Sequence, residues 1–226
     1  MEALTDYLSP DSMGEHGRYT VTSLYYDTVD YKAYWDKLEG HRFRRKVRVR
    51  VYGDQIVTPT TNCFVEIKER LNSALHKERI ILPYADAAAL CGAGGSVEQD
   101  LSQADRAAVE QVQYLHYALQ LQPACVVSYD RLAFDGGEYE PSLRVTFDTH
   151  LKGRVHDLSL LSQSYADNHY LLSPGWCVME VKVNYRVPYW LTELIGQHRC
   201  HLRRISKYCT ALEQCKALLQ KQQIVY

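Results

Sequence analysis

Alternation of apolar and polar residues is the main pattern along this chain, and it predicts a protein built largely from β-strands. Successive side chains of a strand point to opposite faces, so a period of two marks each strand and separates its two faces. Several segments with this pattern or with β-branched runs are bounded by turn residues. They are Tyr19–Tyr26, Arg42–Tyr52, Asn62–Arg70, Lys77–Leu82, Ala124–Phe134, Ser142–Thr149 and Trp176–Asn184.

Helical periodicity appears between and after these strands. Residues 1–8 look like the tail of a helix, turn residues follow at Ser9-Pro10-Asp11, and residues 150–175 show a less regular pattern. Long strands with helices inserted or appended predict an α+β fold dominated by one antiparallel sheet. The expected helices span Asp27–Leu38 (capped by Asp27 or Thr28), Ala85–Cys91, Gln103–Leu119, a short segment opened by Pro188, and Ile205–Gln222.

The polar faces of the predicted strands are mostly basic. Segment Arg42–Tyr52 places Lys46, Arg48 and Arg50 on one face and three valines on the other. A sheet with one charged face in water would look similar strand by strand. The same layout recurs, however, with cations that include Lys68, Lys77, Arg79, Arg131, Arg144 and Lys182.

Three features of the basic faces favour phosphate binding. These faces are rich in Arg, which is suited to bidentate phosphate contacts, whereas a solvated face mixes many polar types. Two strands also place a carboxylate two residues from a cation, in Glu66/Lys68 and Glu180/Lys182, which suits a metal beside an anion. The sheet is large enough to curl and close, which would gather the cations around one axis and require a compensating anion such as a polyphosphate.

The composition fits one folded domain over residues 1–226. Hydrophobic residues are 46% and charged residues 23% of the chain, which is enough for a sizeable core. The formal net charge is −1, so affinity for polyanions must come from the local arrangement of basic side chains. Seven scattered cysteines without CxxC spacing favour reduced thiols over a disulfide framework or a zinc site.

Short motifs follow one another along nearly the whole chain. They are Ser23-Leu24-Tyr25-Tyr26-Asp27-Thr28, the run from Arg44 to Arg50, Phe64-Val65-Glu66-Ile67-Lys68, Lys77-Glu78-Arg79, Tyr129-Asp130-Arg131, Leu143-Arg144-Val145-Thr146-Phe147-Asp148, Met179-Glu180-Val181-Lys182 and Ser206-Lys207-Tyr208. In this order they resemble the VTC domain. That domain is the polyphosphate-polymerase module of vacuolar transporter chaperone complexes and their bacterial relatives, in the triphosphate tunnel metalloenzyme (CYTH-like) superfamily.

The resemblance implies a tunnel-shaped antiparallel β-barrel, with helices packed outside, that binds ATP, triphosphate or polyphosphate along its axis. It also implies transfer of the terminal phosphate of ATP to a growing polyphosphate chain, with Mn²⁺ or Mg²⁺ as cofactor. By motif, Glu180 would hold the metal, and Glu66 would support it or orient a cation. Catalytic cations would be Arg48, Arg50, Lys68, Arg131 and Arg144, with further phosphate binding by Lys46, Lys77, Arg79, Lys182 and Lys207.

The chain departs from the family pattern at its start. VTC domains begin with a strand rich in Arg, Glu and Lys ahead of the first helix, and this strand is expected to be missing here, which would leave an open seam with unpaired edges. Three functions therefore stay open. They are a polyphosphate polymerase, a hydrolase of triphosphate or a nucleoside triphosphate, and a non-catalytic module that binds polyphosphate or inositol phosphate.

Nucleic acid is not an expected partner. The 18 tyrosines could stack on bases, but no RRM, KH or helix-turn-helix pattern accompanies them. No apolar run approaches the roughly 18 residues of a membrane span, and the N-terminus lacks the features of a secretory signal. A cytoplasmic location is therefore predicted, while a membrane-bound or coat-associated partner is left open.

Overall fold

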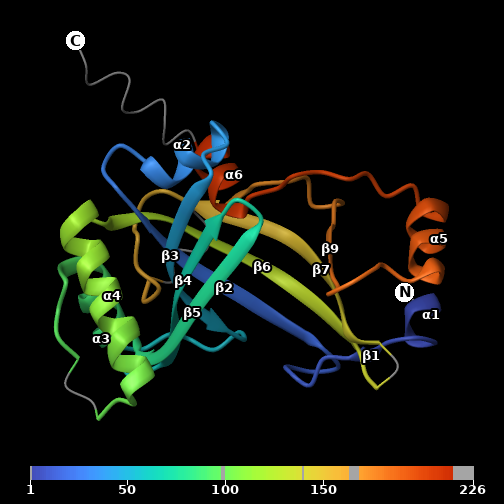
Figure 1. The fold of residues 1–226 in the computed structure, drawn as a ribbon, viewed down its shortest axis with the longest axis horizontal. Helices are drawn as coiled ribbons and strands as arrows, with labels where there is room; N and C mark the ends of the chain where they lie inside the picture. Colours follow the sequence, from blue (N-terminus) through green and yellow to red (C-terminus); the bar gives the residue numbers. More distant parts are fainter. Residues whose placement is uncertain (1, 98–99, 139, 163–167, 216–226) are drawn as a thin grey trace.

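The computed structural model describes residues 2–97, 100–138, 140–162 and 168–215 (Figure 1). Its helices are α1 (Glu2–Thr5), α2 (Lys32–Leu38), α3 (Tyr84–Ala93), α4 (Gln103–Leu119), α5 (Tyr189–Gln197) and α6 (Lys207–Gln214). Its strands are β1 (Ser9–Pro10), β2 (Arg18–Asp27), β3 (Phe43–Tyr52), β4 (Asn62–Leu71), β5 (Ala74–Pro83), β6 (Gln122–Gly136), β7 (Glu140–Arg154), β8 (His169–Tyr170) and β9 (Val178–Lys182).

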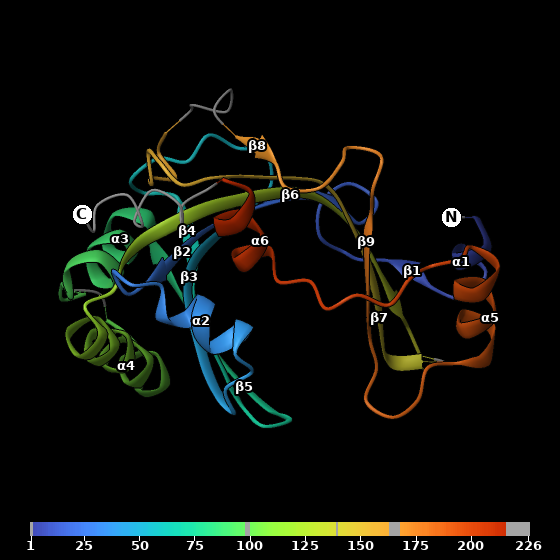
Figure 2. The same ribbon diagram turned by 90° about the horizontal axis from the view of Figure 1, so that it is seen from above.

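All strands belong to one antiparallel sheet. The order is β5-β4-β3-β2-β6-β7-β8, with β1 paired to β6 and β9 paired to β7. Seen from above, the sheet curves into an arch (Figure 2). Among the described strands β5 and β9 do not pair with each other, so the sheet stays open between them. The α+β class is confirmed, but the described strands form a curved open sheet and do not close into the barrel that the resemblance implies, because β5 and β9 do not pair.

Helices α3 and α4 cover the outer face of the sheet over β3, β4 and β5 (Figures 1 and 2). The three valines that alternate with the cations of β3 point to this side, where they pack with Leu90 of α3 and Leu115 of α4. Full burial of such a side chain stabilises the fold by about 1.5–3 kcal/mol. The outer face of these strands is therefore a core layer, and their basic face is the concave one.

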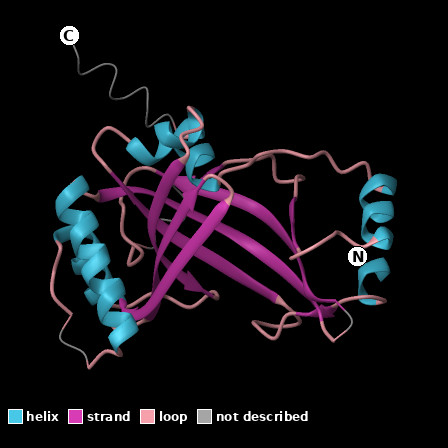
Figure 3. Ribbon diagram, viewed as in Figure 1, coloured by secondary structure: helices cyan, strands magenta, loops and turns pink. Residues whose placement is uncertain are grey.

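At the far side of the molecule, α1 and α5 pack against the outer face of β7 and β9 (Figure 3). Leu4 and Leu191 join Leu143 and Val145 in this second cluster. The Tyr7 and Trp190 rings stack with their centroids 4.2 Å apart. These contacts place the apolar side of β7 outward and its charged side toward the concave face.

Helix α6 differs from these helices because it packs on the concave side. Its Tyr208 and Leu212 join Tyr25, Val127 and Leu151 in a third cluster. Helix α6 therefore covers part of the concave face near α2 (Figure 2).

Asp27, at the end of β2, ties α2 and α6 together. It is 2% exposed, and its carboxylate accepts hydrogen bonds from the backbone N–H groups of Thr28 (2.7 Å), Ala33 (2.9 Å) and Tyr34 (3.3 Å) and from the Tyr208 hydroxyl. Burial raises the pKa of Asp27, and these donors oppose that rise. Asp27 thus satisfies N–H groups in the first turn of α2, but the helix begins at Lys32, so the predicted start at Asp27 is wrong.

Several element boundaries differ from the sequence-based prediction. Ser9–Pro10 forms strand β1 on β6, so the prediction of a turn there is wrong. Strand β9 begins at Val178 and not at Trp176. In the irregular region, β7 continues to Arg154 and β8 pairs with it. The predicted final helix starts near its expected residue, and its part beyond residue 215 lies outside the described residues.

Replacing Tyr208 with Phe should destabilise the protein by about 1.5–3 kcal/mol, because it removes a buried hydrogen bond to a carboxylate without opening a cavity. Urea denaturation measures this change. The matched control is Tyr34→Phe, whose hydroxyl contacts Glu213 at 3.3 Å near the surface, and it should cost less than about 0.5 kcal/mol. Equal losses in both variants would contradict the anchoring role of Asp27.

Candidate functional site: a basic concave face

The concave face gathers the basic residues that the alternation pattern predicts. Strand register places Arg48 of β3 opposite Glu66 of β4, and Glu66 opposite Arg79 of β5. On the other side of the arch, Arg144 of β7 lies opposite Lys182 of β9. All ten predicted cations belong to this set, called the basic face below: Lys46, Arg48, Arg50, Lys68, Lys77, Arg79, Arg131, Arg144, Lys182 and Lys207.

Glu66 holds four cations of the β3–β5 side. It is 1% exposed, with Arg48 on Oε2 at 2.6 Å, Lys77 and Arg79 on Oε1 at 2.6 Å, and Arg50 at 3.8 Å. Burial alone would raise the pKa of Glu66, but the surrounding cations outweigh it and hold that pKa well below its usual range. Because both carboxylate oxygens are occupied, the structure favours cation orientation over metal binding for Glu66.

Asp148 plays the same part on the β6–β7 side. It is fully buried and accepts hydrogen bonds from Arg131 Nε at 2.7 Å and Nη2 at 2.9 Å, and Lys207 of α6 approaches to 2.6 Å. Burial alone would raise the pKa of Asp148, but Arg131 and Lys207 together outweigh burial and lower that pKa below its ordinary value. Through Asp148, α6 brings Lys207 onto the basic face.

Arg144 and Arg50 are also held in place. Arg144 binds Asp135 of β6 at 2.9 Å and the side chain of Asp11. Arg50 donates to Ser23 at 3.0 Å and to the Tyr129 hydroxyl at 3.4 Å. Fixed guanidinium groups lose less entropy when they bind an anion, so these contacts pre-organise the face.

Tyr25 reports the positive potential of this face. Arg48 donates to its hydroxyl at 3.1 Å. Burial would raise the pKa of Tyr25, but Arg48, Arg50 and Lys46 together lower it below its ordinary value. Tyr25, Tyr129 and Asp148 are site residues without an assigned role in the sequence-based prediction. Their signal was their position: Tyr129 lies two residues from Arg131 and Asp148 lies four residues from Arg144, so each shares a strand face with a predicted cation.

Lys68 is the least compensated cation. It makes no hydrogen bond or ion pair within the described residues, although its side chain is still exposed in part. Partial loss of hydration lowers the pKa of Lys68, and the positive charge of Arg48 lowers it further. On β9, Glu180 raises this pKa and Lys182 lowers it, and the net shift is downward. Lys68 of β4 therefore lies within electrostatic reach of Glu180 and Lys182 of β9.

Glu180 is the most accessible carboxylate among the predicted site residues. Its side chain is 44% exposed, and its one ion pair among the described residues is with Lys182 at 3.6 Å. No group of three His, Cys, Asp or Glu residues comes together within the part of the chain that is described. Mg²⁺ and Mn²⁺ need only one or two carboxylates when phosphate oxygens supply further ligands. Glu180 therefore fits the metal ligand that the motif implies.

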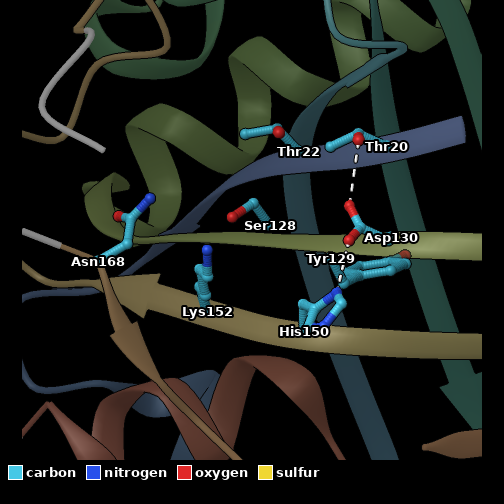
Figure 4. A pocket seen from close by; sticks show the side chains of 8 residues that line it. All are labelled: Thr20, Thr22, Ser128, Tyr129, Asp130, His150, Lys152 and Asn168. Carbon is cyan, nitrogen blue, oxygen red and sulfur yellow. Dashed lines mark hydrogen bonds and ion pairs between the residues drawn. The ribbon is translucent and has the colours of Figure 1, made fainter. Parts of the chain in front are cut away.

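A separate pocket lies on the outer face of the sheet (Figure 4). Its volume is about 160 Å³, and it is lined by Thr20, Thr22, Ser128, Tyr129, Asp130, His150, Lys152 and Asn168. Its polar groups largely satisfy each other, since Asp130 contacts His150 at 2.7 Å and Thr20 at 3.2 Å. It is smaller than most ligand pockets and holds one lysine, so the basic face is the stronger candidate.

Comparison with known proteins identifies the family. The family model of the VTC domain matches residues 1–216, so the chain belongs to the VTC domain family. The resemblance predicted from the motifs is thereby confirmed. No curated protein matched the sequence.

Three solved structures are similar to the chain at low sequence identity. A candidate adenylate cyclase from Bacillus halodurans is 11% identical, with a TM-score of 0.49 and coverage of 91% of this chain and 86% of that one. A protein from Pyrococcus horikoshii is 9% identical, with a TM-score of 0.38 and coverage of 97% and 92%. A Hippeastrum protein described as having a dominant triphosphatase activity is 13% identical, with a TM-score of 0.44 and coverage of 87% and 79%.

Within the described residues, no helix is both long and apolar enough to cross a membrane.

Replacing Glu66 with Gln should destabilise the protein by about 3–5 kcal/mol, because it leaves several cations without their buried counter-charge. Because the pKa of Glu66 is lowered by folding, its contribution is present above about pH 4.3, the unfolded value, and is lost as the pH falls below it. Urea denaturation over a pH series should therefore show a smaller acid loss in E66Q than in the wild type.

The matched control for this prediction is Glu180→Gln, which removes a partly exposed carboxylate. It should change stability by less than about 0.5 kcal/mol. Similar losses in the two variants would show that Glu66 does not organise the basic face.

Proposed function

We propose that this chain is a polyphosphate polymerase-type domain that binds ATP and polyphosphate on the basic face and transfers the terminal phosphate of ATP to the growing chain. One observation carries the proposal: cations from both sides of the arch point to a common concave face, and Lys68 there makes no ion pair with any described residue. A chain of phosphates would supply the negative charge that this face lacks.

The residues would act by binding and charge neutralisation. In the transfer, the bond between the terminal phosphorus of ATP and its bridging oxygen breaks, a bond to a terminal polyphosphate oxygen forms, and ADP leaves. Arg48, Arg50, Lys68, Arg131 and Arg144 would hold the phosphates in line and neutralise the transferred group, with further contacts from Lys46, Lys77, Arg79, Lys182 and Lys207. Such transfers depend mostly on positioning and electrostatics, so no covalent nucleophile is required.

A divalent cation fits this scheme. Mn²⁺ or Mg²⁺ held by Glu180 would neutralise further charge on the phosphates when it is bound. Glu66 would keep Arg48 and Arg79 directed at the ligand and would not bind the metal. A cytoplasmic location and any membrane-bound or coat-associated partner stay predictions from the sequence.

Incubation of the purified protein with ATP and Mn²⁺ should yield long polyphosphate chains on a gel. Stoichiometric release of phosphate without chains would show a hydrolase instead. The absence of both products, with tripolyphosphate still bound in calorimetry, would show a binding module.

Arg48→Ala should weaken tripolyphosphate binding at least about tenfold in calorimetry at fixed salt, because charge-assisted hydrogen bonds contribute about 1.5–3 kcal/mol. Arg106→Ala on α4 is the matched control, since Arg106 is an exposed arginine paired with Asp100. It should bind as the wild type does. An unchanged affinity in R48A would rule out the basic face as the binding site.

The affinity for tripolyphosphate should fall as the pH rises through the lowered pKa of Lys68. The protonated amine binds the anion, and a lowered pKa means that the proton is lost at a lower pH than in an ordinary lysine. Lys68→Arg keeps its charge over this range, so its affinity should fall less steeply. Identical pH profiles for wild type and K68R, measured by calorimetry, would contradict the role of Lys68.

A further inference from the structure

One polar atom of the concave face has no hydrogen-bond partner in the part of the chain that the structure describes. Thr146 is 2% exposed, and within the parts of the chain that are described its hydroxyl is the one buried side-chain polar atom without a hydrogen bond. Its polar neighbours two residues away on β7 are engaged, Asp148 with Arg131 and Arg144 with Asp135. Buried hydroxyls almost always have a partner, so this one indicates a group that binds beside it.

Register places Thr146 beside the expected metal ligand. A cross-strand row runs from Ala133 of β6 through Thr146 of β7 to Glu180 of β9. Directly opposite residues of an antiparallel pair have Cβ atoms about 4.5–5.5 Å apart on the same face. The Thr146 hydroxyl and the Glu180 carboxylate are therefore within reach of a single ion. Ala133 adds only a methyl group to this row.

Charge distinguishes this row from its two neighbours. One neighbouring row contains Arg131 and Asp148, and the other contains Arg144 and Lys182. Both carry cations that repel a metal ion and attract phosphate. The row of Thr146 carries only the negative charge of Glu180. This row therefore offers oxygen ligands to a divalent cation and contains no cationic side chain.

We propose that the Thr146 hydroxyl, together with the Glu180 carboxylate, forms the protein side of a divalent-cation site, with Thr146 binding the ion directly or through one water molecule. The proposal rests on the proposed phosphate-binding function and adds a second protein ligand to it. Hydroxyl oxygens are suitable ligands for Mg²⁺, which prefers oxygen and usually keeps few protein ligands beside phosphates and waters. Phosphates held by Arg131 and Arg144 on either side would complete the coordination.

Mn²⁺ binding, followed by electron paramagnetic resonance of the free ion at saturating tripolyphosphate, tests this proposal. Thr146→Val, which keeps the shape and removes the oxygen, should weaken Mn²⁺ binding about tenfold. Thr146→Ser, which keeps the oxygen, should stay within about twofold of the wild type. Thr149→Val, on the opposite face of β7, is the matched control and should bind Mn²⁺ normally.

Two further measurements make the outcome decisive. T146V should keep the thermal stability of the wild type without metal, because no described residue bonds to the hydroxyl, and it should bind tripolyphosphate normally without Mn²⁺. Unchanged Mn²⁺ affinity, a loss of stability, or weaker metal-free tripolyphosphate binding in T146V would each overturn the proposal.

Glu180→Gln separates failure of this inference from failure of the proposed function. Weaker Mn²⁺ binding in E180Q but not in T146V would leave a metal site without Thr146. Unchanged Mn²⁺ binding in both variants would overturn this cation site. The basic face itself would be rejected only if the wild type did not bind tripolyphosphate.

Discussion

Cations gathered on the concave side of a sheet repel one another, and buried carboxylates between them make the arrangement stable. Glu66 and Asp148 supply this counter-charge on the two sides of the arch. Each is almost fully buried, and each has a lowered pKa because its cations outweigh the effect of burial. Glu66 orients Arg48 and Arg79, and Asp148 orients Arg131 and holds Lys207 of α6 on the same face.

The carboxylates do not neutralise all of the positive charge on the basic face, and the positive charge left over determines what the face can bind. Glu66 serves four cations, whereas Lys68 has no partner among the described side chains. Lys68 on β4 lies within electrostatic reach of Glu180 and Lys182 on β9, the strand at the other side of the arch. A polyanion placed there interacts with both sides at once. Binding and the mutual position of the two sides are therefore expected to be linked.

Much of this arrangement could be predicted from residue alternation. The period of two assigned Arg48, Arg50, Lys68 and Arg144 to the charged faces of their strands, and all lie on the concave face. It left two roles open for Glu66, because alternation shows which face a side chain occupies but not which atoms reach it. Ser9–Pro10 was misassigned because a two-residue strand carries no period, and its pairing with β6 is a tertiary contact.

The sequence by itself determined the α+β class, the VTC family and the face on which each cation lies, because these depend on local periodicity and short motifs. Only the tertiary structure decided which side chains contact each other. Residues distant in the chain meet where Lys207 lies on Asp148, where Arg144 lies between Asp11 and Asp135, and where Thr146 lies beside Glu180. The Thr146 hydroxyl has no hydrogen bond among the described residues. Such contacts follow from strand register and sheet curvature, which the cooperative packing of the whole sheet sets and which no local pattern specifies.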